Sequence, residues 1–190
     1  MLEAVENPLM PGPPTSDRTI SVDAGQQVLL AKRALGPPLS ELPDAAFENA
    51  LVVTTGSTPR RIQRRVEERG LDPRKIGVVP VSSNEVEYEG PLWTGKRVAP
   101  SDLTGISVEV SRGFQYLDPG QGWLVFDSLS TLLLYSEERR VYKLVDWLMG
   151  NARGNDVRGV YSLYRDVVAP PAFGRFRSLC DDLLEIDAGE

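Results

Sequence analysis

A carboxylate and a hydroxyl follow the most apolar short run of the chain. Residues 122–131 read Gly-Trp-Leu-Val-Phe-Asp-Ser-Leu-Ser-Thr, so Asp127 and Ser128 stand at the end of a predicted buried strand. A carboxylate in that place can hold Mg²⁺ through water, and the hydroxyl of Ser128 can add a ligand. The simpler interpretation is that Asp127 caps the following turn by accepting backbone N–H groups. The residues alone leave both interpretations open.

A triphosphate would also require a loop whose N–H groups point inward, with the N-terminus of a helix behind it. The segment after the first predicted strand, residues 28–31, contains Lys32 and Gly36, which are candidates for a partial phosphate contact. It also contains Pro37 and Pro38, which have no N–H to donate and whose φ is fixed. We therefore expect that no phosphate loop closes there.

A second segment resembles a phosphate loop more closely. Residues 90–97, Gly-Pro-Leu-Trp-Thr-Gly-Lys-Arg, match G-x-x-x-x-G-K but carry Arg97 where a Mg²⁺-binding hydroxyl is needed. The preceding residues 85–89 make a poor buried strand, and Pro100 would cut short a following helix. We interpret the segment as a surface loop and keep Lys96 as a candidate for an atypical phosphate contact.

Hydrolysis in this class of α/β domain also needs a carboxylate after the second strand, where it polarises the attacking water. After the predicted strand 50–53 the chain instead has Thr54-Thr55-Gly56-Ser57. This turn can contact an anion through Thr55 or Ser57, but a hydroxyl cannot act as a general base at neutral pH. We expect no catalytic residue, and little or no ATPase activity.

Composition excludes several other chemistries. The 190 residues contain no histidine, which excludes Ser-His-Asp and Cys-His catalysis and His-containing zinc sites within this chain. With Cys180 as the single cysteine, no intrachain disulfide can form. We expect no bound metal or cofactor. A net charge of −6 disfavours wholesale attraction to nucleic acid or to an anionic membrane.

Arginines concentrate on one predicted helix of this acidic chain. The helix begins after a Ser57-Thr58-Pro59 cap and ends at Gly70, with Ile62 and Val66 on its buried face. Four arginines of this segment are candidates for contact with a phosphate backbone or an acidic partner: Arg60, Arg61, Arg64 and Arg65. The simpler interpretation is a solvated helix face. Arg69, Arg74 and Lys75 extend the same basic segment.

The three tryptophans have different expected roles. Trp123 begins the predicted strand that ends at Asp127, and Trp147 packs at the boundary of a predicted helix. Trp93 stands in the polar segment 82–102, where we expect it to be exposed and available as an interface residue.

The predicted elements indicate one domain. We expect a Pro-rich flexible leader over residues 1–17, a domain over 18–187 and a tail over 188–190. Further short strands are predicted over 76–79, 157–163 and 183–186, and helices over 141–150 and 173–179; residues 38–47 favour a short helix, and 105–110 fit a strand or the start of a helix. Strands alternating with helices predict an α/β fold: three layers, with a mainly parallel central sheet and helices on both faces. No run reaches the length of a membrane helix, so we expect a soluble, cytoplasmic protein without membrane contact.

Several segments together resemble the KaiC-like branch of the RecA superfamily. They cover roughly residues 20–187 and are Ala50–Val53, Thr58–Arg60, Asp102–Val108, Trp123–Leu132, Val141–Leu148, Val160–Leu163 and Asp182–Ile186. The chain looks especially similar to short members from halophilic archaea that lack the ATP loop. The resemblance implies a RecA-like fold and places Asp127 at the Mg²⁺-strand position. Members with intact motifs bind ATP, and many form rings or filaments.

Three functional hypotheses follow. The first is a catalytically inactive RecA/KaiC-like domain that acts as a regulatory or scaffolding module for a protein partner or for self-association. The second is an ATP-binding switch or ATPase with an atypical phosphate loop, using Lys32 or Lys96 with Asp127 and Mg²⁺. The third is a DNA accessory protein similar to recombinase paralogues, which would use the arginine-rich helix.

Overall fold

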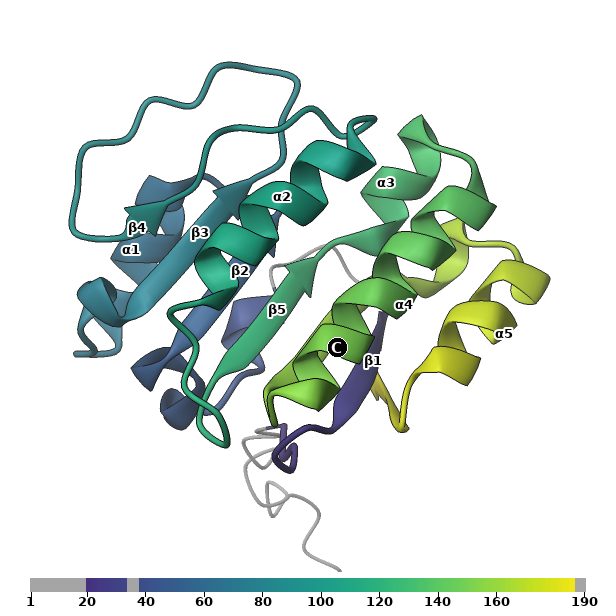
Figure 1. Cartoon of the computed structure of the whole chain (residues 1–190), viewed down its shortest axis with the longest axis horizontal. Helices are drawn as coiled ribbons and strands as arrows, with labels where there is room; N and C mark the ends of the chain where they lie inside the picture. The colour runs from purple at the N-terminus through teal and green to yellow at the C-terminus, as the bar shows by residue number, and fades with distance from the viewer. Residues whose placement is uncertain (1–19, 34–37, 187–190) are drawn as a thin grey trace, which may run out of the picture.

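The chain folds around a central sheet of seven parallel strands in the part that the structure describes (Figure 1). The structure is a computed structural model, and it describes residues 20–33 and 38–186. The strand order is β4-β3-β2-β5-β6-β1-β7. The strands are β1 (Gln27–Lys32), β2 (Ala50–Thr54), β3 (Ile76–Pro80), β4 (Trp93–Thr94), β5 (Trp123–Asp127), β6 (Arg158–Tyr164) and β7 (Asp182–Ile186).

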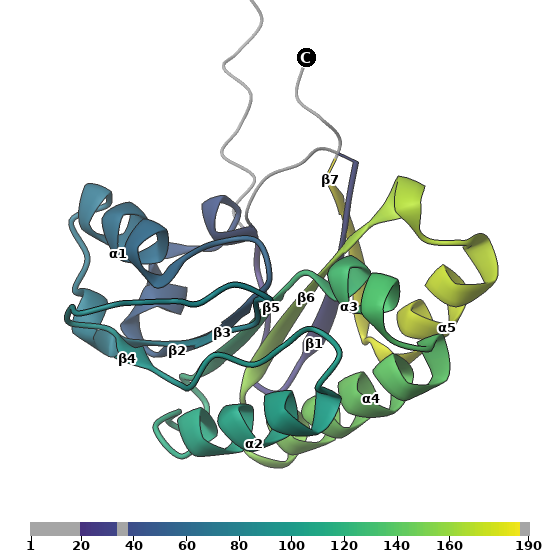
Figure 2. The same ribbon diagram turned by 90° about the horizontal axis from the view of Figure 1, so that it is seen from above.

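Helices cover both faces of the sheet, which confirms the predicted three-layer α/β architecture (Figure 2). One face carries α2 (Leu103–Phe114), α3 (Leu129–Tyr135), α4 (Glu138–Gly154) and α5 (Pro170–Leu179). The other carries α1 (Pro59–Glu68) with the 3₁₀ turns η1 (Pro38–Ser40) and η2 (Asp44–Glu48). Two further 3₁₀ turns are η3 (Pro73–Lys75) and η4 (Arg165–Val167). Each face packs its own hydrophobic cluster against the strands.

Local sequence signals explain where several elements begin and end. The strands β1, β2 and β5 are buried along their whole length, as continuous apolar runs between two helical layers must be. The side chain of Thr58 accepts a hydrogen bond from the N–H of Arg61, and Pro59 occupies the first turn of α1. Gly70 follows that helix with a φ of 71°, a conformation that favours glycine.

Some predicted elements differ from the observed ones. Residues 105–110 lie within helix α2, which settles the choice between strand and helix. The predicted end of the next long helix at Gly150 is wrong, because α4 continues to Gly154. Helix α3 was not predicted. The predicted short helix before Phe47 is replaced by the 3₁₀ turns η1 and η2.

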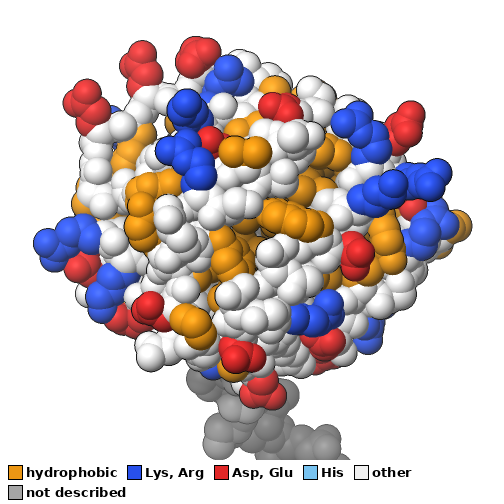
Figure 3. Space-filling model, in the orientation of Figure 1, with side chains coloured by type: hydrophobic (Ala, Val, Ile, Leu, Met, Phe, Trp, Pro, Cys, Tyr) orange, Lys and Arg blue, Asp and Glu red, His pale blue; other side chains and the backbone are white. Residues whose placement is uncertain are grey.

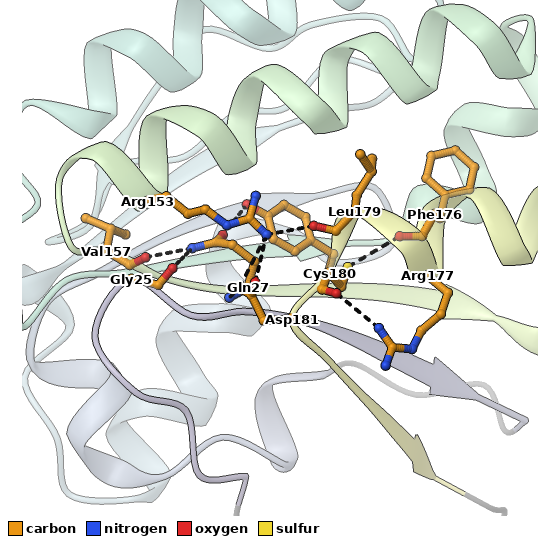
Figure 4. Close-up of polar contacts among 10 residues, drawn as sticks. Gly25, Gln27, Arg153, Val157, Phe176, Arg177, Leu179, Cys180 and Asp181 are labelled. Atoms are coloured by element: carbon orange, nitrogen blue, oxygen red, sulfur yellow. Dashed lines mark hydrogen bonds and ion pairs between the residues drawn. The ribbon is translucent and has the colours of Figure 1, made fainter.

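Polar contacts connect the start of the C-terminal strand β7 with the starts of β1 and β6 (Figure 4). The backbone N–H of Gln27 donates to Asp181 Oδ2 at 2.7 Å, and its side-chain amide donates to the carbonyls of Gly25 and Val157. Arg153 of α4 donates to the carbonyl of Leu179 and to Asp181. These contacts join the first and last strands of the described chain.

Three sequence predictions lie outside the described residues: the leader 1–17, the tail 188–190, and the role of Gly36 and Pro37. Within the described part, no helix has the length and apolar character needed to cross a lipid bilayer.

Candidate functional site

The carboxyl edge of the sheet brings together most of the predicted site residues. The strands β2, β5 and β1 end at Thr54, Asp127 and Lys32, and Thr54 lies opposite Asp127 in the strand register. Strand β6 runs between β5 and β1. Its residue Ser162 therefore lies on the strand that separates Asp127 from Lys32. In open parallel sheets, ligands bind beyond this edge.

Asp127 is buried, with 5% of its surface exposed. Burial raises the pKa of its carboxyl to about 6, against the smaller lowering effects of a hydrogen bond from Ser162 and the charge of Lys32. The Ser162 hydroxyl donates to Asp127 Oδ1 at 3.3 Å. The peptide bond between Asp127 and Ser128 is cis. The carboxyl of Asp127 thus has a pKa of about 6, the hydroxyl of Ser162 as a hydrogen-bond donor and Lys32 as a nearby cation.

Lys32 is also buried, with 4% of its surface exposed. Burial lowers the pKa of its ammonium group, while the charge of Asp127 and that of Glu41 raise it; the nearby charge of Arg65 lowers it further. Asp127 and Lys32 thus form an electrostatically coupled pair across β6, with a second cation from α1 within reach.

The hydroxyls at this edge already have internal partners. Ser128 caps α3 by accepting the N–H of Ser130, and its own N–H donates to Thr55 Oγ1 at 2.9 Å. Thr55 Oγ1 donates in turn to Thr131 Oγ1 at 3.0 Å. The N–H of Ser57 donates to Thr54 Oγ1. The hydroxyls that a Mg²⁺ ion would need are engaged in joining β2 to β5 and α3.

Mg²⁺ therefore does not fit this edge as it is built. The carboxylate of Asp127 lies near the cation Lys32, and the hydroxyl of Ser128 serves as a helix cap. Moreover, no group of three or more His, Cys, Asp or Glu side chains in the described ranges 20–33 and 38–186 could hold a metal ion. The simpler interpretation, that Asp127 accepts backbone N–H groups of the following turn, differs from what the described residues show: the carboxylate accepts from the Ser162 hydroxyl on strand β6.

In its described residues, 38–49, the segment between β1 and β2 has no helix of the kind that a phosphate site uses. Residues 38–49 form η1 and η2, and no α-helix starts there. Their side chains Leu39, Leu42 and Phe47 are buried against the sheet. The backbone of this segment covers the core on the α1 side.

The motif-like segment 90–97 lies elsewhere. It contains β4 at the far end of the sheet, with β3 and β2 between it and β5, so Lys96 is not brought to Asp127. Two of its amide groups are already used: the N–H of Gly95 donates to the carbonyl of Val78, and that of Lys96 donates to Glu109. These two N–H groups are therefore not free to bind a phosphate in this arrangement.

Glu109 is the residue that the sequence analysis missed. This acid of α2 is buried, accepts the N–H of Lys96 at 2.9 Å and pairs with Arg112. It fixes the loop between β4 and α2. Its signal was available, because an acid inside an apolar helical stretch at a core-facing position needs a local donor.

The arginine-rich helix exposes part of its basic face. Arg60, Arg61 and Arg64 are exposed and Arg65 is half-buried, as the spacing from Ile62 and Val66 predicts. The extension of this face has structural roles instead. Arg69 binds the carbonyls of Leu39 and Leu42, Arg74 pairs with Asp72, and Lys75 pairs with Glu48.

The predicted exposure of Trp93 is wrong. Its ring is half-buried against the core and lies 5.8 Å from that of Tyr116, between centroids. Trp147 of α4 is the exposed tryptophan instead, with 41% of its surface accessible. Trp123 is buried at the start of β5, as expected.

Comparison with solved structures supports the fold. One protein of Pyrococcus horikoshii OT3, solved in a structural study, aligns with a TM-score of 0.56 at 15% identity, covering 86% of this chain and 83% of that one. A KaiC-like protein of the same hyperthermophilic archaeon aligns with a TM-score of 0.53 at 19% identity, covering 88% and 74%. At such identities the similarity shows the fold, which is RecA/KaiC-like.

Comparison by sequence gives the family. No curated protein matches the chain. Residues 22–186 match a family described as of unknown function, DUF7504. The match spans all seven strands and five α-helices of the described chain. The chain therefore belongs to the DUF7504 family and has a RecA/KaiC-like fold.

Proposed function

We propose that this chain is a non-hydrolysing RecA/KaiC-like domain that acts as a regulatory or scaffolding protein-interaction module. One observation carries the proposal: no α-helix begins between β1 and β2 in residues 38–49, where a phosphate-binding helix would have to start. In residues 38–49 a bound triphosphate would therefore find no helix N-terminus of the kind that stabilises phosphate groups.

The charged groups at the edge support the same proposal. Asp127 interacts with Lys32 and Ser162, and Thr55 follows strand β2 at the position where hydrolysis needs a carboxylate. Lys32 and Asp127 are also the observation that favours the alternative, an ATP-binding switch. In that case a phosphate would take Lys32 away from Asp127, at the cost of leaving a buried carboxylate without its cation.

Calorimetry and a phosphate-release assay distinguish the non-hydrolysing domain from the ATP-binding switch. We expect the purified chain to show neither heat of binding with ATP and Mg²⁺ nor release of phosphate above that of a heat-inactivated sample. Asp127→Ala and Lys32→Ala are the matched variants. Micromolar binding or turnover that disappears in both variants would show that the edge is a nucleotide site and would overturn the proposal.

The interaction half of the proposal has its own test. The wild-type chain should either self-associate in solution or retain a defined protein from its native host, at a level absent from a mock bait. A chain that stays monomeric and retains nothing contradicts this half. The acidic net charge of −6 supports a protein partner over nucleic acid.

A further inference from the structure

Helix α4 presents a face that the other described residues leave exposed. Its buried side packs against the sheet through residues such as Val141, Val145 and Leu148, and Trp147 points the other way with 41% exposure. In Figure 3, which views the side of α2 and α4, hydrophobic side chains gather across the middle of this face. An exposed tryptophan on a groove is a common anchor of protein interfaces.

Two hollows flank Trp147 between α2 and α4. The hollow on its N-terminal side has a volume of about 420 Å³ and is lined by Leu103, Leu144 and Lys143, among others. The hollow on its C-terminal side has a volume of about 220 Å³ and is lined by Val110, Phe114 and Leu148. The α4 face therefore has an exposed ring between two recesses, a shape that can interlock with a copy of itself.

The charges along the same face are also self-complementary. The first half of the exposed side carries the cations Arg139, Arg140 and Lys143, and the second half begins at Asp146 and ends at the carboxyl terminus of the helix. That terminus carries a partial negative charge. In an antiparallel pair the first half of one α4 lies opposite the second half of the other, so cations meet Asp146 and the helix end.

Within residues 20–33 and 38–186, the cations near Trp147 are not neutralised by ion pairs. Lys143 and Arg140 form no ion pair within the described residues, whereas Arg153, the cation of the last turn, is paired with Asp181. Gly150 is an exposed residue inside the helix, where glycine is less stable than alanine. A Cβ atom there would meet nothing within 4 Å, so packing within the chain does not require glycine.

We propose that a second copy of this chain docks on the α4 face, as a two-fold dimer with antiparallel α4 helices. Trp147 of each copy enters the larger hollow of the other, next to Lys143 and Leu144. Gly150 gives room for the long cations of the partner. Two-fold pairing requires a surface that complements itself, which is what the order of cations, ring and small residues provides. This inference rests on the interaction half of the proposed function.

Sedimentation velocity of the full chain tests the dimer. We expect a concentration-dependent dimer, and a dimer dissociation constant that rises by about tenfold or more in Trp147→Ala and in Gly150→Arg. The second variant keeps the fold, because position 150 is open, yet it adds bulk and like charge opposite Arg140 of the second copy. Arg60→Glu, on α1 at the opposite face, is the matched control and should leave the dimer unchanged.

A cross-link tests the geometry directly. Asp146 lies near the expected two-fold axis, so Asp146→Cys should form a covalent dimer with a short bis-maleimide, and Arg60→Cys should not. The native thiol does not interfere, since Cys180 is buried and its pKa is raised by burial to about 12.

The possible outcomes are distinct. A wild-type chain that remains monomeric at about 100 µM, or a dimer that survives both Trp147→Ala and Gly150→Arg, overturns the docking inference. A monomer that retains a different protein also overturns it and leaves the proposed function standing. A third outcome is a wild-type dimer that hydrolyses ATP, in which Trp147→Ala and Gly150→Arg each abolish dimer formation. That outcome would support the docking inference and overturn the proposed function alone.

Discussion

The carboxylate of Asp127 has the residue type of a Mg²⁺ ligand and the surroundings of a buried structural acid. Desolvation is the largest influence on its pKa, and the hydrogen bond from Ser162 and the charge of Lys32 offset only part of it. A carboxylate that is costly to ionise is a poor resting ligand for a divalent ion without further oxygen donors. The protonation and the ligand-binding capacity of Asp127 therefore depend on Ser162 of β6 and Lys32 of β1.

The raised pKa of Asp127 predicts a pH-dependent stability. Its pKa is about 6 in the folded chain and 3.8 ordinarily, so the folded state holds the proton more tightly. Ionisation is penalised above pH 6, and the penalty disappears as the pH falls toward 4. Relative to Asp127→Asn, the wild-type free energy of unfolding should increase by about 2 kcal/mol between pH 7 and pH 4.5. Urea unfolding of both proteins at several pH values measures this.

The comparison isolates one group. Asp72 and Glu138, whose pKa values are lowered by Arg74 and Arg175, give stability changes of the opposite sign, but both proteins share them. In Ser162→Ala the midpoint of the change should move to higher pH, because the hydrogen bond that favours the carboxylate is lost. A difference between wild type and Asp127→Asn that stays constant with pH would contradict the burial argument.

Among the helices and strands, those with clear start and stop residues or with continuous apolar runs could be predicted from the sequence. Pro59 and Gly70 bracket α1, and the runs ending at Thr54 and Asp127 are buried strands. Helix α3 was missed because its seven residues are too few to show a helical period. The segment 105–110 was ambiguous because alternation over six residues fits a strand and a helix face alike.

The candidate site was predictable only where it depends on strand ends. Lys32, Thr55 and Asp127 meet because parallel strands finish at one edge, which the pattern of strands and helices already implied. Lys96 does not join them, because strand order places β4 at the far end of the sheet. Strand order depends on long-range packing, so no local motif could have excluded Lys96.

Helix packing at α2 predicts opposite effects for two helical glycines. A Cβ atom on Gly113 would lie 2.6 Å from Leu51 Cδ1 and 3.0 Å from the ring of Trp93. Leu51 cannot retreat easily, since it is buried and also contacts Gly77. We expect Gly113→Ala to lower the free energy of unfolding by about 1–3 kcal/mol.

Gly174 of α5 is the control, because a Cβ atom there would meet nothing within 4 Å. Gly174→Ala should raise the free energy of unfolding by up to about 1 kcal/mol through helix propensity. Denaturant curves of the two variants at one pH give both values. Equal effects of the two substitutions would mean that α2 does not pack closely on β2 and β4.

For the molecule as a whole, the order of the strands makes the two ends of the described chain neighbours. Strand β1, near the start, pairs with β6 and β7, the last two strands. The sheet is therefore complete only when its first and last parts have met, and the contacts of Gln27 with Val157 and Asp181 lie at this junction. The free energy of unfolding of the whole domain should therefore depend strongly on this junction, although it consists of only a few hydrogen bonds.

Tyr161 provides the test of that dependence. Its hydroxyl, fully buried in β6, donates to Gln27 Oε1 at 2.9 Å, and burial raises the pKa of the phenol well above its usual range, so it stays a donor. Tyr161→Phe leaves the carboxamide oxygen of Gln27 buried without this donor, which should cost about 1–3 kcal/mol of unfolding free energy. Tyr142→Phe is the matched control: that ring packs against Phe176, and its hydroxyl has no hydrogen bond within the described residues. If the junction governs the whole sheet, Tyr161→Phe will also speed amide hydrogen exchange in β7 and β1 together, whereas protection lost in β6 alone would show that the strands respond separately.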